Sequence, residues 1–167
     1  MIRKRKKYSR PIKPFEKARI EEEDILLKNY ALKSKREVWK ALAKINYFRK
    51  RAMALVKSSK EEQEIFFRKL RDLGFNVKSI GDALDLKLED LLERRLSTIV
   101  ANKGIANTVK QARQMVVHKK ILVGDKVINA PSYIVPVAFE SKITIKQKSP
   151  KNINKIEENP VQNEEAV

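Results

Sequence analysis

The fold is decided by residues 108–126, "TVKQARQMVVHKKILVGDK", where a helix is followed at once by a hairpin. Thr108 has a glutamine three residues after it, which is the spacing of a helix-capping box. Apolar residues then recur at helical spacing and give this helix a side to bury. Residues 121–123 and 127–128 flank the two-residue turn Gly124-Asp125, a pattern that predicts a β-hairpin. The stretch therefore predicts a rigid junction between a helix and a small sheet.

Basic and polar side chains gather where the helix gives way to the hairpin. They are Arg113, His118, Lys119 and Lys120. Arg94 and Arg95 lie on the preceding predicted helix and are expected to line the same surface. Duplex and junction RNA is recognised mainly by its shape and phosphate spacing, so a fixed basic surface can select a folded polyphosphate.

The composition favours a nucleic-acid partner. The 167 residues include 38 Lys and Arg against 21 Asp and Glu, a formal net charge of +17. Such an excess repels itself unless a polyanion offsets it, and neutralising phosphates releases counterions that drive binding. A membrane surface is the weaker alternative, because no apolar window approaches the roughly 20 residues of a spanning helix. No apolar run follows the charged start as it would in a secretory signal, so we expect a cytoplasmic protein.

The residue types give no support for catalysis. The chain has no cysteine and one histidine, which excludes disulfides and thiolate zinc sites and predicts neither a metal nor a cofactor. His118 has no nucleophile or paired acid near it in sequence; it is either packed at a helix end or an RNA contact. The acidic run 21–24 points around a helix rather than converging on one ion, so we expect it to be solvated or to contact a neighbouring protein.

The charge distribution divides the chain into four parts. Residues 1–19 carry nine basic side chains, one acid and two prolines, which predicts an extended basic arm. Residues 20–86 are predicted to form a helical lobe and residues 87–150 a small RNA-binding domain. Residues 151–167, whose last twelve positions hold four glutamates and no basic side chain, are expected to be a disordered acidic tail.

The helical lobe is predicted to contain a long amphipathic helix over residues 34–56, with Ser34 and Glu37 in capping-box spacing. Its expected buried face is Val38, Leu42, Ile45, Ala52, Met53 and Val56, with Arg49 as an exception. Its opposite face is Lys33, Arg36, Lys40, Lys44, Tyr47 and Arg51. With one acid in the segment, this face is either a solvated surface or a phosphate contact. Trp39 and Phe48 are expected in the core.

Four further segments complete the expected organisation. A helix over residues 59–73 ends at Gly74, and residues 79–86 connect the lobes. Residues 87–103 are predicted to form one helix that buries Leu88, Leu91, Leu92, Leu96, Ile99 and Val100. Residues 132–135 are expected to be extended, and residues 142–146 alternate as in a strand.

Residues 91–135, "LLERRLSTIVANKGIANTVKQARQMVVHKKILVGDKVINAPSYIV", resemble the S-four RNA-binding domain. Three further segments are "KKY" in the arm, "ARIEEEDILLKNYALKSKREVWKA" and "LKLEDLLERRLSTIV". They extend the resemblance to the small-subunit ribosomal protein S-four family of the archaeal and eukaryotic type. It implies an α+β, mainly α fold, with a helical N-terminal lobe and an S-four (alpha-L) domain of two helices and a short antiparallel sheet.

The same resemblance implies a structural constituent of the small ribosomal subunit, not an enzyme. Such a protein binds small-subunit ribosomal RNA (rRNA) directly and early, helps to nucleate assembly of the subunit body, and affects translational accuracy where messenger RNA (mRNA) enters. The implied partners are rRNA, neighbouring small-subunit proteins and mRNA in that channel, with no membrane and no small-molecule substrate. Two alternatives stay open: a free-standing factor that binds rRNA or stalled subunits, and an RNA-modifying enzyme.

The expected RNA-binding residues come from the arm, the long helix and the S-four domain. They are Arg3, Arg5, Lys6, Lys7, Arg36, Lys40, Lys44, Arg51, Arg94, Arg95, Lys103, Lys110, Gln111, Arg113, His118, Lys119, Lys120 and Lys126. This chain departs from the family where Asn107 and Val109 replace frequent basic residues, and where Gly124-Asp125 replaces an Asn-Gly turn. Lys119 stands where the family often has a glycine, at a cost of about 1 kcal/mol if the backbone is left-handed.

Overall fold

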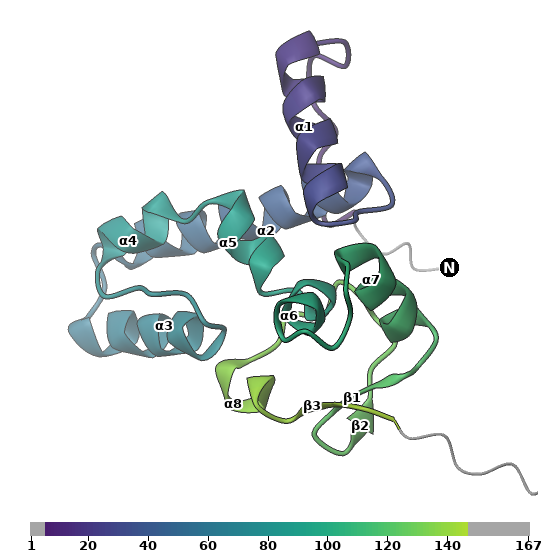
Figure 1. Cartoon of the computed structure of the whole chain (residues 1–167). Coiled ribbons are helices and arrows are strands. Elements are labelled where there is room, and N and C mark those ends of the chain that lie inside the picture. The colour runs from purple at the N-terminus through teal and green to yellow at the C-terminus, as the bar shows by residue number, and fades with distance from the viewer. Residues whose placement is uncertain (1–5, 147–167) are drawn as a thin grey trace, which may run out of the picture.

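The computed structural model of the chain describes residues 6–146, and there it is mainly helical with one small antiparallel sheet (Figure 1). The predicted α+β, mainly α fold class is confirmed. Arg3, Arg5 and the predicted tail lie outside the described residues. The helices are α1 Lys17–Asn29, α2 Lys35–Leu55, α3 Lys60–Asp72, α4 Ile80–Asp85, α5 Leu88–Glu93, α6 Leu96–Asn102, α7 Val109–Val117 and α8 Val137–Glu140, and the strands are β1 Ile121–Val123, β2 Lys126–Val127 and β3 Ile143–Ile145.

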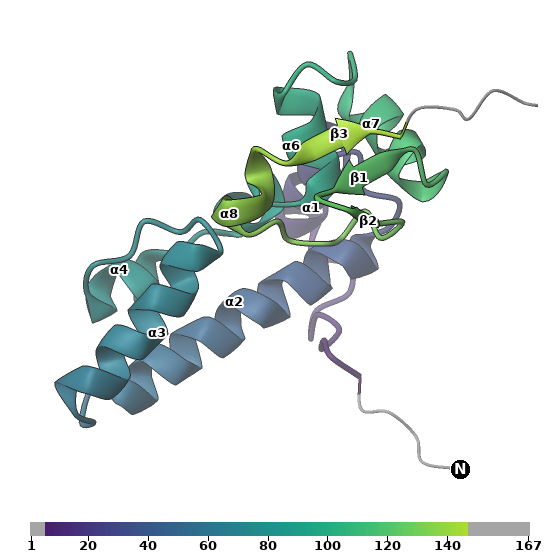
Figure 2. The same cartoon turned by 90° about the horizontal axis from the view of Figure 1, so that it is seen from below.

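The long helix α2 supports the N-terminal part of the chain. α3 runs back beside it, α4 and α5 pack on it, and α1 contacts its N-terminal end (Figures 1 and 2). These helices share one hydrophobic cluster that extends from Leu32 to Leu92. Ser59 caps α3 by accepting a hydrogen bond from the Glu62 N–H.

The buried face of α2 differs from the predicted one. The buried residues are Val38, Ala41, Ile45, Phe48, Ala52 and Leu55, at alternating spacings of three and four, whereas Leu42, Met53 and Val56 are exposed. The predicted face was wrong at those three positions, because α4 and α5 cover the side of α2 that carries the small Ala41 and Ala52. Arg49 lies beside this face and donates to the carbonyl of Leu86 at 2.8 Å.

Two segments of the lobe boundary were predicted incorrectly. Residues 79–86 are not a plain connection: Ser79 and Asp82 form a capping box that starts α4, which buries Ala83. Residues 87–103 are two helices, broken at Arg94 and Arg95. The break arises because the backbone there pairs with residues 133–135: the Leu96 N–H donates to the Tyr133 carbonyl, and the Val135 N–H to the Arg94 carbonyl.

The C-terminal part surrounds a second hydrophobic cluster. It comprises Leu96, Ile99, Val100, Ala106, Ala112, Val116, Ile121, Val123, Val135 and Ile143. α6 and α7 lie on one side of a sheet with strand order β2-β1-β3. The predicted hairpin and the predicted strand over residues 142–146 are confirmed, with β2 one residue earlier than expected. Gly124 has φ +61 whereas Asp125 does not have a positive φ, the combination expected of a type II′ turn.

Candidate nucleic-acid interface

The basic turn, His118, Lys119 and Lys120, joins α7 to β1 with a fixed backbone. Lys119 has φ 58, and its N–H donates to the Val116 carbonyl at 3.0 Å. The Lys120 N–H donates to the Met115 carbonyl at 3.0 Å. These two bonds form the Schellman motif, in which a left-handed residue ends a helix. The backbone at Lys119 is therefore left-handed, with a lysine in place of the glycine that the family often has there.

The sequence on either side of the basic turn anchors it. Val116 before it and Ile121 after it are fully buried, and the Lys120 carbonyl accepts the Lys146 N–H at 2.8 Å. The three side chains of the turn are exposed. A fixed backbone thus presents flexible cationic side chains to solvent, which suits contact with phosphates at set spacing.

Four other predicted residues also have exposed side chains: Lys103, Lys110, Gln111 and Lys126. Thr108 caps α7 as predicted, accepting the Gln111 N–H at 3.2 Å, while Gln111 Oε1 accepts the Asn107 N–H at 3.1 Å. Lys103 Nζ donates to the backbone carbonyl of Glu140. Gln111 and Lys103 therefore also have protein partners.

Glu37 of α2 joins the two parts of the chain by binding two of the predicted RNA-binding arginines. Its Oε2 accepts from Arg95 Nη2 at 2.7 Å and from Arg113 Nη1 at 3.0 Å, and its Oε1 accepts from Arg113 Nη2 at 2.7 Å. Arg113 also donates to the Ala31 carbonyl. The capping box predicted at Ser34 does not form with side chains, because the Glu37 carboxylate faces these arginines instead. We call Glu37, Arg95 and Arg113 the interlobe clamp.

The clamp holds Glu37 ionised. Burial alone would raise the pKa of Glu37, but hydrogen bonds from Arg113 and Arg95 outweigh it and lower the pKa to about 2. The Arg95 side chain is only 5% exposed. A direct phosphate contact by Arg95 would require this pair to open, so the structure gives Arg95 a protein-facing role that the sequence did not predict.

Arg94, which precedes Arg95 at the helix break, also binds protein groups from several segments. Its guanidinium donates to the carbonyls of Leu73 at 3.1 Å and Val135 at 3.0 Å, and to Glu140 Oε2 at 2.9 Å. A Cβ at Gly74, which has φ +89, would lie 2.5 Å from Arg94 Nε. Gly74 therefore ends α3, as predicted, and also leaves room for this guanidinium.

The basic face of α2 is available to a partner. Arg36, Lys40, Lys44 and Arg51 are exposed, as are Lys6 and Lys7 of the arm. Among the described residues, none of these six side chains forms an ion pair. The basic turn and this face together form the candidate interface.

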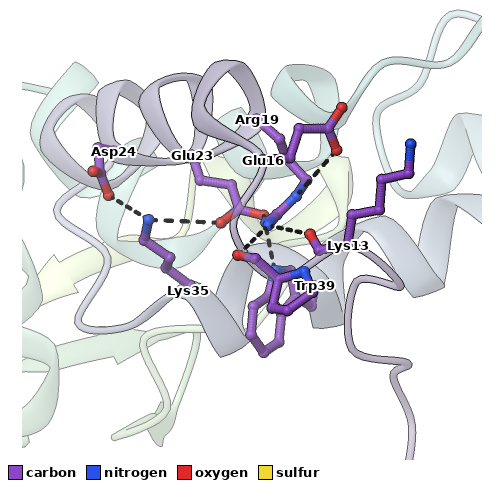
Figure 3. Close-up of polar contacts among 8 residues, drawn as sticks. Lys13, Glu16, Arg19, Glu23, Asp24, Lys35 and Trp39 are labelled. Carbon is purple, nitrogen blue, oxygen red and sulfur yellow. Dashed lines mark hydrogen bonds and ion pairs between the residues drawn. The ribbon is translucent and has the colours of Figure 1, made fainter.

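One residue of the acidic run 21–24, Glu23, is buried and binds other side chains. Glu23 is 6% exposed, and its Oε1 accepts from Arg19 at 2.6 Å and from the Trp39 indole at 2.9 Å (Figure 3). Arg19 also donates to the carbonyls of Lys13 and Pro14, so it fixes the arm against α1. The expectation of a solvated run was wrong for Glu23. Only its helical spacing to Arg19 hinted at this contact.

Two kinds of feature are absent from the part of the chain that the structure describes, residues 6–146. That part of the chain contains no cluster of three or more His, Cys, Asp or Glu side chains placed to hold a metal ion. None of the helices described there is long and apolar enough to cross a membrane.

The chain is similar in sequence to one protein family model and to several known proteins. Residues 94–138 match the model of the S4 domain family. The chain is 41% identical to "Small ribosomal subunit protein uS4" of Nanoarchaeum equitans over 158 residues, 90% of this chain and 88% of the relative. It is 40% identical to the protein of that name from Picrophilus torridus (87% and 85% covered) and 42% identical to that of Methanococcus aeolicus (87% and 86% covered).

Proposed function

The chain belongs to the family of small ribosomal subunit protein uS4, and on that premise we propose that it is a structural constituent of the small subunit that binds rRNA directly. The observation that carries this proposal is the basic turn, three exposed cationic or titratable residues on a backbone held by a Schellman motif and a buried core. Its place of action is the ribosome, and its chemistry is recognition rather than catalysis.

Sedimentation tests the constitutive role. We expect the chain to remain with small subunits after a wash in high salt, because many contacts act together in an assembled particle. A free-standing factor held by phosphate contacts would dissociate, since such contacts weaken steeply with salt. Recovery of the chain in the salt wash, with intact subunits depleted of it, would overturn the proposal.

The RNA-binding surface is tested by replacing Lys120 of the basic turn and Lys110 of α7 with alanine. Each lost phosphate contact should reduce the slope of log affinity against log salt by about 0.9. Lys57→Ala, at an exposed position in the turn after α2, is the matched control and should leave the slope unchanged. An equal effect of all three changes would place the RNA-binding surface elsewhere.

The finer roles implied by the family are part of the proposal. The interlobe clamp and Arg94 tie the helical lobe to the S4 domain, so the basic turn and the basic face of α2 can hold two RNA segments at a fixed separation. This supports early binding that nucleates the subunit body, and a contribution to translational accuracy where mRNA enters. Omission of the chain from subunit reconstitution should delay assembly of the body, and clamp variants should alter misreading of a reporter.

A further inference from the structure

A cavity of about 750 Å³ lies between the arm and α2, outside the S4 domain. It is lined by Lys6, Lys7, Tyr8, Lys40, Ala43, Lys44 and Tyr47. Figure 2 shows the arm, in purple, passing beside the N-terminal half of α2. The cavity is partly open to solvent, and its volume is within the range of ligand-binding clefts.

The charge of this cavity favours an anion. Four of its lining residues are lysines and none is acidic. Lys40 Nζ lies 6.0 Å from the centroid of the Tyr8 ring, so a cation is already next to an aromatic face. Within residues 6–146 these four lysines have no carboxylate partner.

The aromatic side chains of the cavity favour a planar group beside that anion. Tyr47 is 64% exposed, although it belongs to α2, which buries six of its residues. Its ring centroid lies 6.0 Å from that of the neighbouring Phe48, whose side chain is buried. Tyr8 is held against Trp39, with centroids 6.2 Å apart. An exposed ring that lines a cavity together with four lysines has the features of a site that stacks a base and binds its phosphates.

We propose that this cavity binds one unpaired nucleotide of RNA, its base stacked on Tyr47 and its phosphates held by the lysines. The nucleotide is unpaired because a base inside a duplex is covered on both faces by its neighbours and cannot stack on a tyrosine. This inference rests on the proposed function and deepens it. In the proposed function, the basic turn contacts the phosphate backbone of folded RNA. The cavity instead selects a nucleotide in a single-stranded segment.

The test uses two RNA octamers of equal charge and the full chain. One octamer consists only of abasic ribose phosphates, and the other carries a single central adenine. We expect the intact chain to prefer the adenine octamer by roughly tenfold, within the range for one base stacked on an aromatic side chain. Tyr47→Leu should abolish this preference by weakening only the adenine octamer, and Tyr47→Phe should retain it.

The controls separate stacking from general damage. Phe139→Leu removes another exposed aromatic ring, outside the cavity, and should change neither affinity. The salt slope of the abasic octamer should be the same for Tyr47→Leu and the intact chain. The inference is overturned if the intact chain shows no preference, or if Tyr47→Leu weakens both octamers equally. In either case, retention of the chain by salt-washed subunits would still support the proposed function, so the two failures are distinguishable.

Discussion

Replacing Glu37 with glutamine should destabilise the chain strongly, because it leaves two arginines facing each other without their shared carboxylate. Arg95 is almost fully buried, and removing one member of a buried ion pair costs about 3–5 kcal/mol. The pKa of Glu37, lowered by the same two arginines, gives a second magnitude. A pKa lowered from 4.5 to about 2 is a change of roughly 2.5, or about 3 kcal/mol. Both routes predict a loss of about 3 kcal/mol in the free energy of unfolding at pH 7.

The same carboxylate predicts the pH dependence of stability. Because the pKa of Glu37 is lower in the folded chain, its stabilising effect is present above pH 4.5 and is lost as the pH falls towards 2. Urea unfolding of the intact chain and of Glu37→Gln should therefore differ at pH 7 and converge over that window. Glu64→Gln, at an exposed position of α3, is the control and should change little. A difference below about 1 kcal/mol, or one independent of pH, would refute the clamp as a stabilising contact.

Two further substitutions test backbone conformations. Lys119→Gly should raise the free energy of unfolding by about 1 kcal/mol in urea titrations, since φ 58 is strained for lysine; no gain would mean that the turn adopts another conformation in solution. Gly74→Ala should destabilise more than Gly104→Ala. Both glycines have positive φ, but only at Gly74 would the new Cβ collide with Arg94, whereas nothing lies within 4 Å at Gly104. Equal losses in thermal unfolding would show that Arg94 moves aside freely.

The features predicted correctly from sequence depend on residues close together along the chain. The cap at Thr108, the two-residue turn at Gly124 and the alternation in β3 act over two to five positions, so their residue types specify them. The break between α5 and α6 depends instead on pairing with Ile134, almost forty positions away. No local pattern in residues 87–103 indicates it, since each half has good helical spacing.

The chemistry of the candidate interface was predictable from the sequence. Which basic residues face solvent and which bind other protein groups was not. The excess of Lys and Arg indicated phosphate contact, and Lys120 and Lys40 are exposed as such a role requires. Sequence could not show that Arg95 and Arg113 bind Glu37, because that depends on how α2 meets α7 in space. The isolation of Glu37 in a basic segment was the one available signal for this contact.

The antiparallel pairing of β3 with β1 has a consequence for any truncation of this chain. The S4 family match ends at residue 138, but β3 covers Ile143–Ile145 and pairs with all three residues of β1. A piece excised at residue 138 would leave β1 with a free hydrogen-bonding edge beside Ile121 and Val123, the kind of edge that recruits other chains into aggregates. An isolated S4 domain therefore needs a C-terminal boundary beyond residue 145.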